Sequence, residues 1–416
     1  MHNLRKFLSV SVTVLILFLL KVDLTAGIHT YKSSSVLTQG RFVKIKIKES
    51  GVYKLTYEDL NAMGIQPANV RIFGYGGALL NQSFLASRID DLSEIAIHME
   101  KGNDGIFNSG DYVLFYAQGV NSWIYNTSLG MFTHTINHYS NYGYYFVTSD
   151  AGEGRKIQSV NVEVPASYTD ITEFTDYSVH EKELMSLANS GKEFYGETFS
   201  DILSYNLNYT FPNVVKSANA VKVRLDVAAA STVASNFALS LNSEQSKTLS
   251  VAARTPNDNY EKARLANGVF TFTPSTDLLN FNLTYVKSNS TSKGYLNYLE
   301  MNVKRSLVMT GQVMQFQNID NFGVDSYSRF LLSNAGPNTK VWDITNHTNI
   351  TSVNGDLNNG VLSFYSSNKT LKQYLAIDPT AGASFPKPEI VGAIENQNLH
   401  GLPQVDMLII THPAFI

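Results

Sequence analysis

The stretch Phe42-Val43-Lys44-Ile45-Lys46-Ile47-Lys48-Glu49-Ser50-Gly51-Val52-Tyr53-Lys54-Leu55 decides the fold class of this chain of 416 residues. Its branched residues alternate with lysines up to Lys48, so one face of the segment is apolar and the other is charged, as in a half-buried strand. Residues 49–51 then turn the chain, and residues 52–55 return it as a second strand. The stretch therefore predicts two antiparallel strands joined by a short turn.

The same alternation recurs over most of the chain, between turns rich in Ser, Asn and Gly. Many short strands of this kind are typical of a β-sandwich. Residues 56–64 have the pattern of a short helix with a Thr cap and a Gly end, and residues 171–199 are expected to be partly helical or irregular. The predicted fold class is mainly β, with sandwich-like N-terminal domains. The expected organisation is a signal peptide over residues 1–26, a β-rich N-terminal domain over 28–155, a β-sandwich domain over 160–305, a small β-rich region over 306–380, a linker over 381–397 and an incomplete α/β domain over 398–416.

The composition excludes several classes of protein. Hydrophobic residues make up 44% and charged residues only 16% of the sequence, which excludes a highly charged disordered chain. The net charge of −3 provides no basic surface, so no nucleic-acid partner is expected. The sequence contains no cysteine, which excludes thiol catalysis, thiolate metal sites and disulfides within these residues.

The N-terminus has the order of a secretory signal. Arg5 and Lys6 precede the apolar residues 7–20, and Leu24-Thr25-Ala26-Gly27 is a small-residue cleavage site. The alternative is a membrane anchor, but the run of about 14 residues is shorter than the roughly 20 that a spanning helix needs. We therefore expect an exported protein. Export without cysteine fits a bacterial envelope protein better than a disulfide-built eukaryotic domain.

The pattern changes near the C-terminus. Prolines in the predicted linker precede Val405-Asp406-Met407-Leu408-Ile409-Ile410, a nearly unbroken apolar run typical of a strand buried on both faces of a parallel sheet. Such a strand needs a crossover and neighbouring strands to cover it. We therefore expect an α/β domain to begin near Leu399 and the 416 residues to be the front part of a longer protein. The alternative is that the strand pairs back into the preceding β unit.

No motif in the sequence indicates a convincing active site. The nucleophile elbow and the His-Glu-X-X-His zinc helix are both absent. His134 and His138 would share a metal only on a helix, so polar surface histidines are the simpler interpretation. Residues 74–77, Gly-Tyr-Gly-Gly, lack the Lys-Ser/Thr of a phosphate loop and predict a tight turn with positive φ. We predict no catalytic, cofactor-binding or metal residues, and no cofactor.

Two acidic segments leave more than one interpretation. The stretch Asn103-Asp104-Gly105-Ile106-Phe107-Asn108-Ser109-Gly110-Asp111 carries oxygen atoms that could wrap a calcium ion. Because no Glu closes it at the spacing of the twelve-residue calcium loop, a plain turn between strands is the alternative. The pair Asp90-Asp91 is of a kind too common to indicate acid–base catalysis.

Seven segments, taken in order, resemble the surface sortases of the bacterial type IX secretion system, which are gingipain-type cysteine peptidases. Each segment is only modestly specific, but their common order along nearly the whole mature chain is considerably more so. The last of them resembles the first strand of a gingipain-type peptidase domain. The segments are residues 42–60, 70–77, 104–116, 190–197, 341–345, 396–402 and 405–411.

The resemblance implies a cysteine peptidase that works as a transpeptidase. Such proteins remove the C-terminal sorting domain of secreted cargo at the outer surface and join the cargo to an anionic lipopolysaccharide. Their caspase-like domain uses a Cys–His dyad that lies beyond its first strand, so neither residue is in this chain, and His400 and His412 are not assigned that role. The implied partners are secreted cargo with C-terminal sorting domains and other type IX secretion components. The implied location is the outer-membrane-associated surface of a Gram-negative bacterium, and the β domains would dock partners or position cargo.

The residues themselves are also compatible with two other functions. A non-enzymatic, exported β-sandwich protein for adhesion or glycan binding would be complete without more chain. A secreted hydrolase of another class would need clustered carboxylates or a metal site in the folded β units, and the sequence shows no such cluster.

Overall fold

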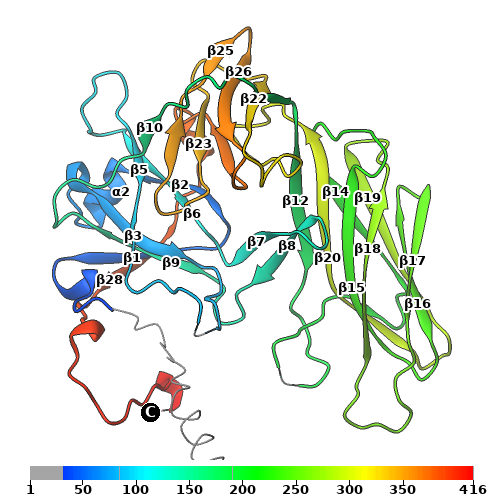
Figure 1. Ribbon diagram of the computed structural model, residues 1–416. Coiled ribbons are helices and arrows are strands. Elements are labelled where there is room, and N and C mark those ends of the chain that lie inside the picture. The colour runs from blue at the N-terminus through cyan, green and yellow to red at the C-terminus, as the bar shows by residue number, and fades with distance from the viewer. Residues whose placement is uncertain (1–30, 84, 190, 416) are drawn as a thin grey trace, which may run out of the picture. The chain divides into compact units, whose positions relative to one another are not determined.

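The computed structural model describes residues 31–415 except positions 84 and 190, so the expected signal peptide lies outside the described residues. The described chain consists mostly of strands in antiparallel sheets (Figure 1), which confirms the mainly β fold class. It divides into two compact units, one formed by the described residues up to Thr38, those of Leu80–Asp91 and those from Gln397 onward, and the other by the described residues of Gln39–Leu79 and Leu92–Asn396. Among the described residues, no helix is long and apolar enough to cross a membrane.

Two small sheets pack around the first core of the larger unit. One has the strand order β28-β1-β9-β3-β4 and the other the order β2-β6-β5. The predicted strands on either side of residues 48–50 therefore both form, as β1 and β2, but they do not pair with each other. Val43, Ile45 and Leu55 instead meet in one apolar core, because the turn carries the chain from one sheet to the next. The strands are β1 (Phe42–Ile47), β2 (Gly51–Thr56), β3 (Arg71–Gly76), β4 (Glu94–Ile95), β5 (Ile97–Glu100), β6 (Tyr112–Ala117), β9 (Gly143–Thr148) and β28 (Glu389–Ile394).

The predicted short helix is α2 (Tyr57–Ala62), which begins where β2 ends. The Thr56 hydroxyl accepts from the Asp59 N–H, and the Asp59 carboxylate accepts from the Thr56 N–H. This reciprocal pair satisfies two N–H groups that would otherwise lack partners at the start of the helix. Short 3₁₀ turns complete the helical content of the described residues: η1 (Val36–Thr38), η2 (Pro67–Asn69), η3 (Gly382–Ser384), η4 (Leu399–Gly401) and η5 (Pro413–Phe415).

A β-sandwich forms the second core of the larger unit. Its sheets have the orders β12-β20-β15-β18 and β14-β19-β16-β17, and β13 also pairs with β20. The alternating apolar residues of β15 and β20 point into a core shared with β16 and β19. Residues 173–181, expected to be partly helical or irregular, are instead strand β12, because they pair along their whole length with β20. The strands are β12 (Glu173–Glu181), β13 (Thr198–Phe199), β14 (Ser204–Thr210), β15 (Val221–Ala230), β16 (Ser235–Leu241), β17 (Gln245–Val251), β18 (Arg264–Phe272), β19 (Leu278–Val286) and β20 (Lys293–Ser306).

The later part of the chain adds two more sheets, with the orders β10-β24-β23-β27-β21 and β11-β22-β26-β25. These sheets enclose a core that contains Phe316, Phe330 and Phe364. A further apolar cluster joins Trp342 and Leu375 to Leu114 of β6, so this region packs against the β2-β6-β5 sheet. The strands are β10 (Gln158–Val160), β11 (Thr169–Ile171), β21 (Val313–Phe316), β22 (Tyr327–Ser333), β23 (Lys340–Asp343), β24 (Thr351–Val353), β25 (Asp356–Asn358), β26 (Val361–Ser367) and β27 (Tyr374–Ile377).

The segments after residue 380 differ from the sequence prediction in secondary structure. Within the predicted linker, β28 pairs with β1 from Phe42 to Lys46 and completes the first sheet. Residues 405–411 form no strand, and the side chains of their apolar members are exposed, from 58% at Val405 to 88% at Ile410. An apolar run becomes a buried strand only where other strands pair with it and cover it, and no described residue does so here. The domain boundaries drawn from the sequence stay a prediction.

Candidate binding site

The hairpin of β7 (Asn121–Asn126) and β8 (Met131–Ile136) contacts the sandwich within the larger unit. It rests on the face of the β12-β20-β15 sheet that points away from the sandwich core (Figure 1). The ring of Trp123 is stacked on that of Tyr177, with centroids 4.4 Å apart. The N–H of Phe132 donates to the Asn302 side-chain oxygen at 2.6 Å, and the Asn302 amide donates back to the Phe132 carbonyl at 2.9 Å. The hairpin is thus held by a ring stack and a reciprocal amide pair.

A buried ionic cluster fixes the same hairpin. Nδ1 of His134 lies 2.5 Å from Glu300 Oε1, and its Nε2 lies 2.8 Å from Glu181 Oε2. Burial by itself lowers the pKa of His134, but the hydrogen bonds to the two carboxylates outweigh burial and raise it to about 9. The imidazole is therefore protonated at neutral pH, and both ring nitrogens donate. Arg224 Nη1, 3.3 Å from Glu300 Oε2, adds a second cation to the cluster.

A further carboxyl group next to this cluster is held partly neutral. Burial, followed by repulsion from Glu181 and Glu193, raises the pKa of Glu183 to about 7. Burial also raises the pKa of Asp226, which accepts a hydrogen bond from the Asn297 amide. Despite these carboxylates, no group of three or more His, Asp or Glu residues in the described part of the chain is arranged to hold a metal ion. The cluster is therefore an ionic contact between two parts of the fold.

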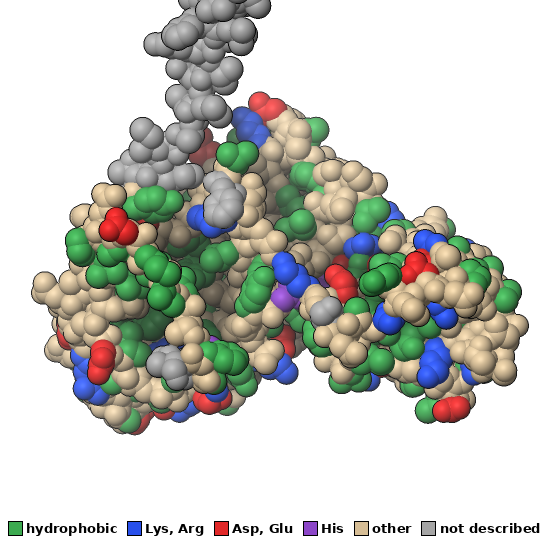
Figure 2. All heavy atoms as spheres, turned by 90° about the horizontal axis from the view of Figure 1, so that it is seen from below, with side chains coloured by type: hydrophobic (Ala, Val, Ile, Leu, Met, Phe, Trp, Pro, Cys, Tyr) green, Lys and Arg blue, Asp and Glu red, His purple; other side chains and the backbone are tan. Residues whose placement is uncertain are grey.

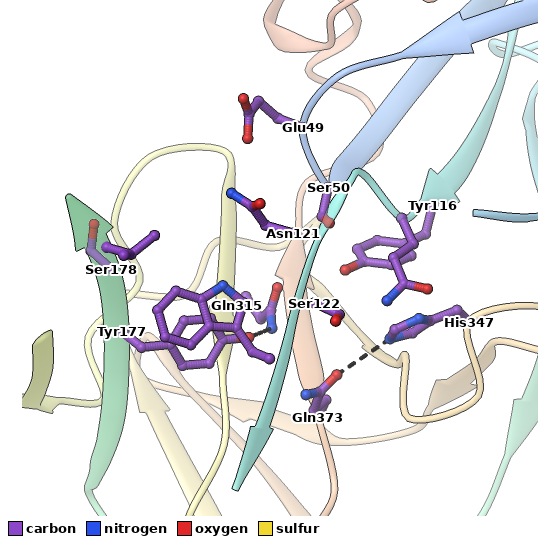
Figure 3. Close-up of a pocket in the computed structure, with 13 residues that line it drawn as sticks. Glu49, Ser50, Tyr116, Asn121, Ser122, Tyr177, Ser178, Gln315, His347 and Gln373 are labelled. Carbon is purple, nitrogen blue, oxygen red and sulfur yellow. Dashed lines mark hydrogen bonds between the residues drawn. The ribbon is translucent and has the colours of Figure 1, made fainter. Parts of the chain in front are cut away.

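A cavity of about 320 Å³ opens beside the hairpin. In Figure 3, Tyr177 and Ser178 of β12 lie on one side, Tyr116, His347 and Gln373 lie on the other, and residues of β7 lie between them. A volume of this size is at the lower end of the range for small-ligand pockets. The lining residues are Glu49, Ser50, Tyr116, Gln118, Asn121, Ser122, Trp123, Tyr177, Ser178, Val179, Gln315, His347 and Gln373.

The cavity wall is polar but almost uncharged. Burial lowers the pKa of His347, which leaves its ring neutral at pH 7, and its Nε2 lies 3.4 Å from Gln373 Oε1. Burial raises the pKa of Tyr116 to about 12, and it also raises that of Tyr177, whose hydroxyl accepts from Gln315 Nε2 at 2.7 Å. Glu49 is the one carboxylate in the wall, and no Lys or Arg lines it.

The arrangement suits binding rather than catalysis. Four amide side chains, from Gln118, Asn121, Gln315 and Gln373, present both donors and acceptors. Oδ1 of Asn121 is buried and has no hydrogen-bond partner among the described residues. No described serine is hydrogen-bonded to His347, so the cavity holds no nucleophile–base pair of the kind used in covalent catalysis.

The structure accounts differently for the residues that the sequence singled out. His134 is buried and charged, so the prediction of a surface histidine is wrong for it. Its partners are 47 and 166 residues away in sequence, and no local motif could have revealed them. Gly76 has a φ of 96°, which confirms the positive φ predicted for residues 74–77, although it ends strand β3 at a bulge rather than forming a separate turn.

The acidic side chains of both segments accept hydrogen bonds that hold nearby backbone in place. Asp104 Oδ1 accepts from the Ile106 N–H at 2.9 Å, and Asp111 Oδ2 accepts from the Asn108 N–H at 2.8 Å, as expected for a turn. In the smaller unit, the Asp91 carboxylate accepts from Ser35 Oγ and the Val36 N–H, which anchors the start of η1. The sequence did not identify the cavity, whose wall comes from six separate stretches between residues 49 and 373.

Fold and site together define an almost wholly β protein with several sheets and an uncharged polar cavity among them. No family model matches the sequence, and a search of curated proteins found no significant match. Among solved structures, the chain is similar to dimeric latent PorU from Porphyromonas gingivalis, with a TM-score of 0.77, 26% identity and 90% of this chain covered. The similarity lies in the N-terminal part of PorU and covers 35% of it, so this chain spans about a third of the PorU chain.

This similarity confirms the resemblance that the seven sequence segments indicated, and the chain is related in structure to a type IX secretion sortase. Two weaker likenesses are to a CBM36 domain of a xylanase from the hindgut metagenome of Trinervitermes trinervoides and to a CBM36 module in complex with calcium and xylotriose. Their TM-scores are 0.22 and 0.20, their identities are both 12%, and they cover 30% and 32% of this chain but 96% and 99% of those chains. At this level they have no bearing on function.

Proposed function

We propose that this chain is the N-terminal part of a type IX secretion surface sortase. The complete protein would be a gingipain-type cysteine peptidase and transpeptidase that removes C-terminal sorting domains from secreted cargo and attaches the cargo to the cell surface. It would be exported by its N-terminal signal to the outer-membrane-associated surface of a Gram-negative bacterium. The observation that supports this function is the likeness to PorU over 90% of the chain at a TM-score of 0.77.

In this proposal, the described β domains form a scaffold that docks cargo or other secretion components. A thiolate mechanism needs a thiol, and the 416 residues contain no cysteine, so the chain by itself performs no such chemistry. The domain expected to supply the thiol would begin near Leu399, and residues 405–411 would form its first strand. Their exposed apolar side chains support this proposal, because a strand of an α/β domain is covered on both faces by other parts of that domain.

The coding sequence beyond codon 416 tests the proposal most directly. We expect it to continue in frame into an α/β domain that contains one His and one Cys suited to a dyad. A stop codon directly after Ile416 would exclude the function. A second experiment would delete the gene from its host and follow the mass of secreted cargo by immunoblot. Cargo is expected to keep its C-terminal sorting domain, and normal processing in the deletion strain would contradict the assignment.

The isolated chain should have no peptidase activity. We expect no cleavage of a fluorogenic peptide substrate above the buffer rate, with or without a reducing agent, because the chain has no thiol to activate. Cleavage that a thiol-directed inhibitor abolishes would contradict this expectation.

A further inference from the structure

The cavity beside the hairpin includes part of an unpaired strand edge. β12 pairs with β20 on one side, and it has no strand partner on the other along residues 177–181 in the described part of the chain. Tyr177, Ser178 and Val179 of this strand line the cavity. An unpaired edge presents a row of N–H and C=O groups to which another extended chain can add.

The direction of the Val179 peptide groups follows from bonds on both sides of the sheet. The N–H of Lys304 in β20 donates to the Ala220 carbonyl at 2.8 Å. In this part of β20, the N–H and C=O groups of even-numbered residues therefore point toward β15, and those of odd-numbered residues point toward β12. Val179 lies opposite Glu300, which is even-numbered, so its own N–H and C=O point away from β20. The N–H of Thr175, four residues earlier on the same edge, likewise donates outward, to Gln317.

Closer to the cavity, this edge has no strand to pair with. The Tyr177 N–H is taken by the Asp176 carboxylate at 2.8 Å, whereas no described residue hydrogen-bonds to the outward groups of Val179. The half-buried Val179 backbone is therefore the first point on β12 at which an added strand could exchange main-chain hydrogen bonds.

The rest of the wall indicates what kind of chain would bind. The amide side chains of Gln118, Asn121, Gln315 and Gln373 match the alternating donors and acceptors of a peptide backbone. No Lys or Arg is among the described residues that line the cavity, which disfavours recognition of a phosphate or a terminal carboxylate, so the bound segment would be internal. Because Glu49 in the wall is acidic, the one kind of charged residue that the bound segment could place beside it is a basic residue.

The aromatic residues disfavour a saccharide. Sugar sites usually offer an open aromatic face, but Trp123 is stacked on Tyr177, and the ring of Tyr116 lies 5.3 Å from that of His347. Each aromatic ring in the wall thus already packs against another ring. We propose that this cavity binds an extended, uncharged, internal segment of a polypeptide, which adds as a strand to the β12 edge at Val179. All the residues named for this site lie in this chain, and the proposal does not depend on the proposed sortase function.

The test uses a random dodecapeptide phage library panned on the immobilised chain, with Val179→Pro as the decisive variant. Proline removes the outward N–H without touching the ladder to β20, and an edge position tolerates it. Val269→Pro on β18 is the matched control, because its N–H also points outward from an edge strand but lies away from the cavity. Urea unfolding establishes that both variants are folded.

We expect enriched peptides with few charged residues that bind Val179→Pro at least tenfold more weakly than the unaltered chain and bind Val269→Pro unchanged. If Val179→Pro does not fold, the double variant Gln315→Leu, Gln373→Leu takes its place, with the same tenfold loss expected. The proposal would be overturned if panning enriched no peptides, or if the enriched peptides bound both proline variants equally. Saturable binding of xylotetraose or cellotetraose, followed by tryptophan fluorescence, in the absence of any peptide binding would overturn it as well. None of these outcomes depends on the coding sequence beyond codon 416, so this proposal and the sortase assignment are tested independently.

Discussion

Two contacts inside the larger unit hold parts of the chain together by different chemistry. The later sheets meet the β2-β6-β5 sheet through an apolar cluster around Trp342, Leu114 and Leu375. The β7–β8 hairpin meets the sandwich through ions and amides, with His134 between Glu181 and Glu300. Apolar burial depends little on pH or salt, whereas an ion pair depends on the protonation of both partners. The comparison therefore predicts one contact that is indifferent to pH and one that is sensitive to it.

The face shown in Figure 2 gives no sign of a third, long-range electrostatic contact. Figure 2 shows Lys and Arg side chains interspersed with Asp and Glu over the face in view. With a net charge of −3, mixed charges of this kind produce no extended field of one sign. Local packing and buried ionic contacts such as that of His134 therefore hold the parts of this unit together.

The largest effect is expected from Trp342→Ala in the apolar contact. Trp342 is 1% exposed, and its truncation should lower the free energy of unfolding by about 4 kcal/mol through lost burial and the cavity left behind. Urea unfolding measures this loss, which should be the same at pH 6 and pH 9. A loss below about 1 kcal/mol would show that this contact contributes little to stability.

Next in size is His134→Gln in the ionic contact. The pKa of His134 is raised from 6.5 to about 9 in the folded protein. Its stabilisation is therefore fully present below pH 6.5 and is lost as the pH rises through about 9. This corresponds to about 3 kcal/mol at pH 6. We expect the difference in unfolding free energy between His134→Gln and the unaltered chain to shrink toward zero by pH 10.

The nearby Glu183 must be controlled in that experiment. Its pKa is raised from 4.5 to about 7, so it lowers the stability as the pH rises from about 4.5 to about 7, and this window meets that of His134 at its upper end. The comparison is therefore best made in a Glu183→Gln background. A His134→Gln effect that stays constant from pH 6 to pH 10 would mean that the imidazole is not charged in the folded state.

A smaller effect is expected from Glu300→Gln, which keeps the shape of the side chain and removes its charge. It should cost about 2 kcal/mol, because a charge-assisted hydrogen bond to His134 becomes a neutral one. The sharper measurement is the His134 pKa by NMR titration, which should move down from about 9 toward its ordinary value. A pKa that does not move would show that Glu300 has no part in holding the proton.

The smallest effect is expected at an exposed ion pair. Lys387 Nζ lies 2.7 Å from Asp59 Oδ2, and the lysine side chain is 50% exposed. Because water and salt screen such a pair, Lys387→Met should change the unfolding free energy by about 0.5 kcal/mol, and 0.5 M NaCl should remove the difference. A loss of unfolding free energy as large as that of Glu300→Gln would mean that the exposed ion pair contributes as much stability as the buried one in this protein.

Local patterns predicted much of the secondary structure. The alternation of Val43, Ile45 and Ile47 with lysines predicted β1, and Thr56 with the residues after it predicted the capped helix α2. Both signals work because they lie within a few residues of one another. The pattern failed at residues 173–181, where the apolar alternation is weak and pairing with β20 decides the structure. It also failed at residues 405–411, where the apolar signal is strong but no described strand pairs with it.

The candidate site could not be predicted in this way. Its wall joins stretches as far apart as Glu49 and Gln373. Asn121 and Gln315 have no unusual sequence context, and nothing local marks Val179 as a residue with unpaired outward peptide groups. One general signal was present, since residues 49–51 were expected to be a turn, and loops on a rigid scaffold often carry binding residues.

The sequence by itself determined the mainly β class, the capped helix and the absence of thiol chemistry in these residues, because each depends on composition or on near neighbours. The tertiary structure alone decided that β1 and β2 join different sheets and that His134 is buried between Glu181 and Glu300. It also decided that β12 keeps a free edge at the cavity. Those features depend on which distant strands pair and which faces pack together, and an alternating pattern states only that a strand has an apolar face, not which partner will cover it.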